Sequence, residues 1–198
     1  MRVLGVVVVV VGVAVVACTG GGGAFGKEDL PRIVLRADEA PEGTRKVAGR
    51  GGPQDLEAFA TDPDERDALV ADGFVQGYVA YFAPETYFAV SRPSDEELES
   101  AISVQVIAGL FEAPRGAASS LDRYVEDLST RQVPGAATEP WDGLGQEGFR
   151  LEGRVGDGST VIAYLWRVEN LVLVVAGSGP IGDDLMRELA RTVDARTR

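Results

Sequence analysis

Two patterns of hydrophobic and polar residues divide most of the chain into strands and helices. Apolar residues that alternate with polar or small ones predict strands over residues 74–82, 101–111, 149–154 and 160–168. Apolar residues at helical spacing predict helices through residues 117–128 and 183–195, with shorter helices at 53–60 and 62–73. Residues 29–35 suggest one or two helical turns, and residues 50–53 and 133–141 suggest loops, with a turn at Pro84.

The last third of the chain predicts a three-stranded meander followed by a closing helix. Short turn-forming segments separate residues 149–154, 160–168 and 171–177. Residues 171–175 are continuously apolar, which is typical of a central strand covered on both faces. We therefore expect a single α+β domain, in which helices pack on a mostly antiparallel sheet of about five to seven strands.

The first residues have the pattern of an export signal. Arg2 precedes an uncharged run over residues 3–17, which is shorter than the roughly 20 residues that a membrane-spanning helix needs. The run ends in Val15-Val16-Ala17-Cys18, and a glycine-rich stretch follows. The alternatives are an ordinary secretory peptide or a single-span anchor that happens to contain a cysteine.

Val15-Val16-Ala17-Cys18 resembles the lipobox of bacterial lipoproteins, with valine where leucine is usual. The resemblance implies that residues 1–17 are removed and that Cys18 carries a diacylglyceryl group, with further acylation at its new amino terminus. Residues 18–28 would then form a flexible tether, and residues 29–198 an extracytoplasmic domain. The membrane is the partner that this anchor implies.

Composition excludes several classes of function. Removing Arg2 with the leader leaves 18 of the 19 basic residues against 31 acidic ones, for a formal charge of −13, so nucleic acid is not an expected partner. There is no histidine, and Cys18 is the single cysteine, so histidine-based nucleophile activation, histidine zinc sites and thiol redox chemistry are excluded. We expect no cofactor, no bound metal and no catalysis.

Two motifs suggest chemistry that their context does not favour. Residues 177–182 fit G-x-G-x-x-G between a strand and a helix, but no further strand or ribose-binding acid follows, so a tight strand-to-helix turn is favoured over dinucleotide binding. Asp62, Asp64 and Asp67 suggest calcium ligands. The glycine and glutamate of an EF-hand loop are missing at the required positions, and capping of a helix that begins at Pro63 is favoured.

Aromatic and acidic residues supply the remaining candidates. We expect Trp141, in a loop between proline and glycine residues, to reach a surface or pocket as a ligand or partner contact, while the aromatic residues of the strands fill the core. Glu147 and Glu152 are candidates for the carboxylate pair of a hydrolase.

The mature part resembles small actinobacterial-type lipoproteins with an α+β domain of the PsbP-like or sensor-like kind. The resemblance is carried by a Phe-x-x-x-x-Gly-Ala step at residues 111–117 and by Leu-Gly-x-Glu at residues 144–147. We expect a non-catalytic binding or interaction lipoprotein on the outer face of the cell membrane, which meets an envelope protein or a small ligand. The first alternative is a carrier of a hydrophobic ligand in a cavity between sheet and helices; the second is a carboxylate-based hydrolase.

Overall fold

The computed structural model describes residues 24–84, 101–156 and 158–198. The leader, Cys18 and the region around residues 87–99 lie outside this part of the chain. The described strands are β1 (Thr44–Lys46), β2 (Gly52–Gln54), β3 (Phe74–Pro84), β4 (Ser103–Phe111), β5 (Ala137–Pro140), β6 (Glu147–Arg154), β7 (Thr160–Val168) and β8 (Leu171–Ser178). The described α-helices are α1 (Leu30–Ile33), α2 (Leu56–Phe59), α3 (Pro63–Ala71), α6 (Pro114–Asp127) and α7 (Asp183–Asp194).

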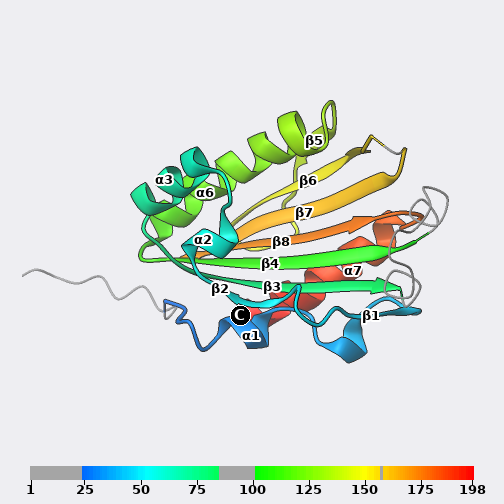
Figure 1. Ribbon diagram of the computed structural model, residues 1–198, viewed down its shortest axis with the longest axis horizontal. Helices are drawn as coiled ribbons and strands as arrows, with labels where there is room; N and C mark the ends of the chain where they lie inside the picture. The colour runs from blue at the N-terminus through cyan, green and yellow to red at the C-terminus, as the bar shows by residue number, and fades with distance from the viewer. Residues whose placement is uncertain (1–23, 85–100, 157) are drawn as a thin grey trace, which may run out of the picture.

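The strands form one antiparallel sheet in the order β1-β3-β4-β8-β7-β6-β5, and β2 also pairs with β3 (Figure 1). The predicted meander is confirmed as β6, β7 and β8. Strand β8 lies at the centre between β4 and β7, and Leu171–Val175 are buried, as the continuous apolar run predicts. The predicted α+β class, with a mostly antiparallel sheet and helices packed on it, is confirmed.

Helices α6 and α7 cover opposite faces of this sheet. Alternation along β8 shows the division, because Leu173 and Val175 join a core with α1 and α7, whereas Val172 and Val174 join a core with α3 and α6. Figure 1 shows α7 passing behind the strands, with α3 and α6 together on the other side. The sheet therefore has one hydrophobic core on each face, one beneath α7 and the other beneath α6.

The sequence predicts a short edge strand at residues 45–49, and β1 lies there at Thr44–Lys46, but two other short edge strands were not predicted. Strand β2 occupies part of the expected loop at 50–53, and β5 lies within the expected loop at 133–141. Pro84, where a turn is predicted, pairs with Thr44 as the last residue of β3, and the residues after it lie outside the described part of the chain. All four residues of β5 are exposed, so the strand has no apolar alternation for a sequence pattern to reveal. Strand β5 is defined by its backbone pairing with β6.

Candidate functional site

Helix α3 begins where the sequence predicts, and its cap accounts for the acidic residues there. Asp62 accepts hydrogen bonds through Oδ1 from the backbone N–H groups of Asp64 (2.8 Å) and Glu65 (3.2 Å), and Pro63 is the first helical residue. This confirms the interpretation of Asp62 as a cap. The same start places Glu65, Ala68 and Leu69 on one side of α3 by their spacing of three and four residues.

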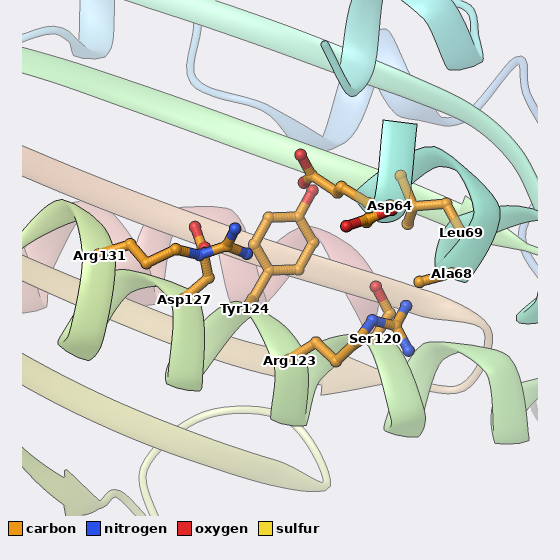
Figure 2. Close-up of a pocket in the computed structure, with 9 residues that line it drawn as sticks. Asp64, Ala68, Leu69, Ser120, Arg123, Tyr124, Asp127 and Arg131 are labelled. Carbon is orange, nitrogen blue, oxygen red and sulfur yellow. The ribbon is translucent and has the colours of Figure 1, made fainter. Parts of the chain in front are cut away.

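That side of α3 faces α6 across a cleft of about 230 Å³. Helix α6 contributes Ser120, Tyr124 and Asp127, again at spacings of four and three residues. Figure 2 shows the ring of Tyr124 in the middle of the cleft, with its hydroxyl directed toward α3. Ser120 and Leu69 are almost fully buried, so they lie at its inner end.

A second cleft, of about 450 Å³, adjoins the first and shares Glu65 and Tyr124 with it. It lies where helices leave part of the sheet uncovered, because Val79, Gln105 and Ile107 there are only half-buried. We call the two clefts together the α3–α6 groove. Its full lining is Gly49, Arg50, Gln54, Ala58, Phe59, Thr61, Asp64, Glu65, Ala68, Leu69, Val79, Gln105, Ile107, Ser120, Arg123, Tyr124, Asp127, Arg131 and Gln132.

Some charged side chains that line the α3–α6 cleft form ion pairs with a neighbour, and others do not. Arg123 forms an ion pair with Asp72, and Arg131 forms one with Asp127. The carboxylate of Glu65 has neither an ion pair nor a hydrogen bond within the part of the chain that the structure describes. Glu65 therefore places an unmatched negative charge where the two clefts meet.

The surroundings of Glu65 disfavour its charged form. Burial raises the pKa of the Glu65 carboxyl and the nearby carboxylate of Asp127 raises it further, while the charges of Arg131 and Arg123 offset this only in part. Burial also raises the pKa of the Tyr124 hydroxyl, with the charge of Glu65 as the next cause, so the two groups lie within electrostatic reach of one another. A positively charged group in the groove would relieve this.

Ser120 contributes a second unmatched polar atom. Its Oγ is buried and has no hydrogen-bond partner in the structure, and Ser120 is 1% exposed. A buried hydroxyl without a partner destabilises the fold by about 1 to 3 kcal/mol. Its place at the inner end of a cleft therefore makes that cleft a candidate binding site. No base is hydrogen-bonded to this hydroxyl, so it lacks the arrangement of an activated nucleophile.

Trp141, the predicted contact residue, lies on the other face of the sheet. It is half-buried against the core that contains α7. Its ring meets Tyr164 edge to face at 5.4 Å between centroids, and the guanidinium of Arg187 lies 5.7 Å from it. The indole Nε1 is buried and has no hydrogen-bond partner among the residues that the structure describes. The role of Trp141 as a ligand contact stays a prediction, separate from the α3–α6 groove.

Glu147 and Glu152 do not form the expected pair. They stand five positions apart on β6, so their side chains point to opposite faces of the sheet. Glu147 accepts a hydrogen bond from Arg167 (2.8 Å), and Glu152 accepts one from Arg150 (2.5 Å). The interpretation of these two residues as a catalytic carboxylate pair is wrong, because the strand geometry separates them.

The glycines of residues 177–182 build a turn, as expected. Gly179 has φ of +95°, and a Cβ there would lie 2.3 Å from the backbone oxygen of Ala101. The α7 helix that follows begins with Asp183 and Asp184, whose negative charges occupy the helix end at which a pyrophosphate would bind. This geometry favours the strand-to-helix turn over a dinucleotide site.

Sequence reasoning did not identify Glu65, Ser120 or Tyr124 as site residues. Glu65 lies in the first turn of the helix predicted at 62–73, where an acidic residue is common, and Tyr124 lies in the apolar stripe of the helix predicted at 117–128. The available signal was Ser120, a polar residue beside Leu121 in the same stripe, where a core position would be apolar. The partner of that serine depends on how α3 and α6 pack, which spacing within one helix does not reveal.

Among the described residues, no helix combines the length and the apolar character needed to cross a bilayer. Cys18 itself lies outside the described part, so the predicted lipidation rests on the sequence.

Comparison with known proteins identifies a structural relative. No family model matches the sequence, and no curated protein matches it. Among solved structures, the chain is similar to the extracellular domain of PknH from Mycobacterium tuberculosis, with a TM-score of 0.51 and 11% sequence identity. The match covers 89% of this chain and 98% of that domain, so the two share a fold over nearly their whole length.

Proposed function

We propose that this protein is a lipid-anchored, non-catalytic domain on the outer face of the cell membrane, and that it binds its ligand or partner in the α3–α6 groove. The observation that carries the proposal is the buried hydroxyl of Ser120, which has no hydrogen-bond partner among the described residues and lines the same cleft as the half-buried carboxylate of Glu65. In contrast, Asp183 forms ion pairs with Arg150 and Arg187, which is typical of a structural role.

The predicted anchor supports this location. A lipobox-like sequence ends at Cys18, and the backbone of Phe25 is already bonded to the domain through Asn170. Seven residues span at most about 25 Å when fully extended, so a lipid on Cys18 would hold the domain close to the bilayer. The fold supports the location as well, because a domain of the same fold is extracellular in PknH.

Metabolic labelling tests the anchor. Cells that express the wild type or Cys18→Ser are grown with an alkyne fatty acid, and the protein is examined for label and for access to a membrane-impermeant biotin reagent on intact spheroplasts. We expect label and biotin on the wild type, with the fatty-acid label lost from Cys18→Ser. Equal fatty-acid labelling of both proteins would contradict the anchor, and a wild type that biotin cannot reach would contradict the location.

Occupation of the groove tests the binding role. Three series of small probes, cationic, anionic and neutral, are titrated into ¹⁵N-labelled protein carrying Cys18→Ser, and amide shifts on α3 and α6 are recorded. We expect at least one series to perturb these amides. Ala68→Phe should abolish the response by filling the cleft, because Ala68 lines it. Val70→Phe is the matched control, since Val70 lies on the same helix and is 61% exposed.

Failure of all three series to perturb the groove would contradict the binding role. An undiminished response in Ala68→Phe would place any binding elsewhere.

A further inference from the structure

Building on the proposed binding role, we infer that the α3–α6 groove takes a primary ammonium group on a short aliphatic stem. In this arrangement the carboxylate of Glu65 is the counter-ion, and the oxygens of Ser120 and Tyr124 accept the remaining ammonium hydrogen bonds.

The charge of the ligand follows from the ion pairs already made. Both arginines that line the α3–α6 cleft are committed, Arg123 to Asp72 and Arg131 to Asp127, and Arg50, which lines the adjoining cleft, also has an interaction partner. Glu65 has no ion pair within the described part of the chain. Burial, Asp127 and Asp62 raise the pKa of its carboxyl, and the charges of Arg131 and Arg123, each already paired with an aspartate, lower it in part. An anion would meet this negative charge, whereas a cation neutralises it.

The polar atoms fix the chemistry of the cation. Ser120 Oγ is an acceptor at the inner end of the cleft and has no hydrogen-bond partner among the described residues. The Tyr124 hydroxyl is directed toward α3 (Figure 2), and it lies within electrostatic reach of Glu65. An ammonium group has three N–H donors, which matches a carboxylate and two hydroxyl oxygens. Among the described residues, no group of three or more acidic or other metal-binding side chains could hold a metal ion, so an organic cation fits better.

The walls of the cleft suit an aliphatic stem. Ala68 and Leu69 present apolar atoms on the α3 side, and the ring of Tyr124 stands opposite them. An aromatic face also attracts a cation through the negative charge of its ring face. At about 30 Å³ for each water-sized group, 230 Å³ has room for about seven groups, which accommodates a stem of about four carbons with its ammonium.

The decisive experiment compares probes that differ only in charge. n-Butylammonium, n-butanol and n-butyrate are titrated at pH 7 into the ¹⁵N-labelled Cys18→Ser protein, and dissociation constants are fitted from amide shifts of α3 and α6. We expect n-butylammonium to bind at least tenfold more tightly than either of the other two. Equal or tighter binding of butyrate or butanol would overturn the ammonium assignment and leave the groove as a binding site for another class of ligand.

Two substitutions locate the ammonium. Glu65→Gln should weaken n-butylammonium binding at least tenfold, while Glu126→Gln, the same change of charge at an exposed position of α6, should leave it within twofold. Ser120→Ala, which a helix accepts readily, should weaken binding severalfold. Unchanged affinity in Glu65→Gln would overturn the proposal. Unchanged amide spectra away from the groove show that each variant remains folded.

A last titration identifies the source of the ammonium group. A lysine residue capped at both ends carries the same stem and charge as part of a peptide. If it binds at least as tightly as n-butylammonium, the groove accepts lysine side chains of a protein partner. If it binds at least tenfold more weakly, the ligand is a small amine. Failure of both amines to bind would overturn the proposal.

Discussion

Asn170 holds the backbone of Phe25 with two hydrogen bonds, although the residues are 145 positions apart in the chain. Asn170 Oδ1 accepts from the Phe25 N–H (3.0 Å), and Nδ2 donates to the Phe25 carbonyl (3.2 Å) and to the Phe111 carbonyl (2.8 Å). One buried side chain therefore joins the start of the domain, the end of β4 and the β7–β8 turn. The sequence predicts a tether through residue 28, and these bonds join the chain to the domain at Phe25.

Replacing Asn170 with alanine should destabilise the domain by about 2 to 3 kcal/mol. The substitution leaves the buried carbonyl of Phe111 without its side-chain donor and releases both polar groups of Phe25. Urea unfolding measures the loss, and hydrogen exchange should show a much faster rate at the Phe25 amide. Asn170→Asp should also destabilise, because a carboxylate keeps the acceptor and loses the donor.

Gln132→Ala is the control for Asn170→Ala, since the Gln132 amide makes a surface hydrogen bond to Asp127. We expect a change of less than about 0.5 kcal/mol there. Equal stability of Asn170→Ala and the wild type would show that the Asn170–Phe25 link does not support the fold.

Acid should weaken the attachment of α7 to the sheet. Burial works to raise the pKa of the Asp183 carboxyl, but hydrogen bonds from Arg187, Arg150 and Tyr164 outweigh it and hold the pKa at about 2. A carboxyl whose pKa is lower in the folded than in the unfolded state stabilises the fold above its unfolded pKa. The contribution of Asp183 should therefore be complete above about pH 4 and lost as the pH falls to about 2.

The size of this effect is about 1 to 2 kcal/mol after allowance for solvent screening. Urea unfolding at several pH values between 2 and 7 should show a shallower pH dependence in Asp183→Asn than in the wild type. Asp184→Asn, at the neighbouring and 96% exposed side chain, should follow the wild type. Identical pH profiles for Asp183→Asn and the wild type would contradict this role.

Much of the fold follows from local sequence patterns, because each long strand and helix carries a periodicity of its own. Residues 171–175 are an example, since a run without polar residues is stable only where both faces are covered. In contrast, β5 has four exposed residues and no pattern, so its pairing with β6 is a tertiary effect. Alternation of apolar and polar residues cannot reveal short edge strands of this kind.

The two motifs that carry the resemblance to actinobacterial-type lipoproteins occupy places of close backbone contact. A Cβ on Gly116 would lie 1.9 Å from the carbonyl oxygen of Asp72, so α6 begins as close to the α3–β3 connection as glycine permits. The N–H of Gly145 donates to the buried carboxylate of Asp194 (2.9 Å), which fastens that loop to α7. Packing within the domain therefore explains these motifs.

The groove residues belong to no motif, since Glu65 and Tyr124 come together only when α3 packs on α6.

The glycines of residues 177–182 should respond unequally to alanine. Gly179→Ala forces a residue with Cβ into φ of +95° and against the Ala101 carbonyl, so we expect a loss of more than about 2 kcal/mol. Gly182→Ala meets no atom within 4 Å at φ of −89°, so its cost should stay below about 1 kcal/mol. Thermal unfolding measures both. A cost of Gly182→Ala equal to that of Gly179→Ala would show that the turn does not explain these glycines.

Substitutions of Trp141 distinguish a role in packing from a role in ligand binding. Its ring packs on Tyr164, yet its Nε1–H is buried without an acceptor, so Trp141→Phe keeps an aromatic ring and removes an unsatisfied donor. If packing is the role of Trp141, Trp141→Phe should change the free energy of unfolding by less than about 1 kcal/mol, and Trp141→Ala should cost about 2 to 3 kcal/mol. Trp166→Phe is the comparison, because Trp166 is fully buried and the smaller ring leaves a cavity that should cost more than Trp141→Phe. A Trp141→Ala protein as stable as the wild type would argue against packing and favour the predicted contact role, since a half-buried aromatic ring that contributes nothing to stability needs another explanation.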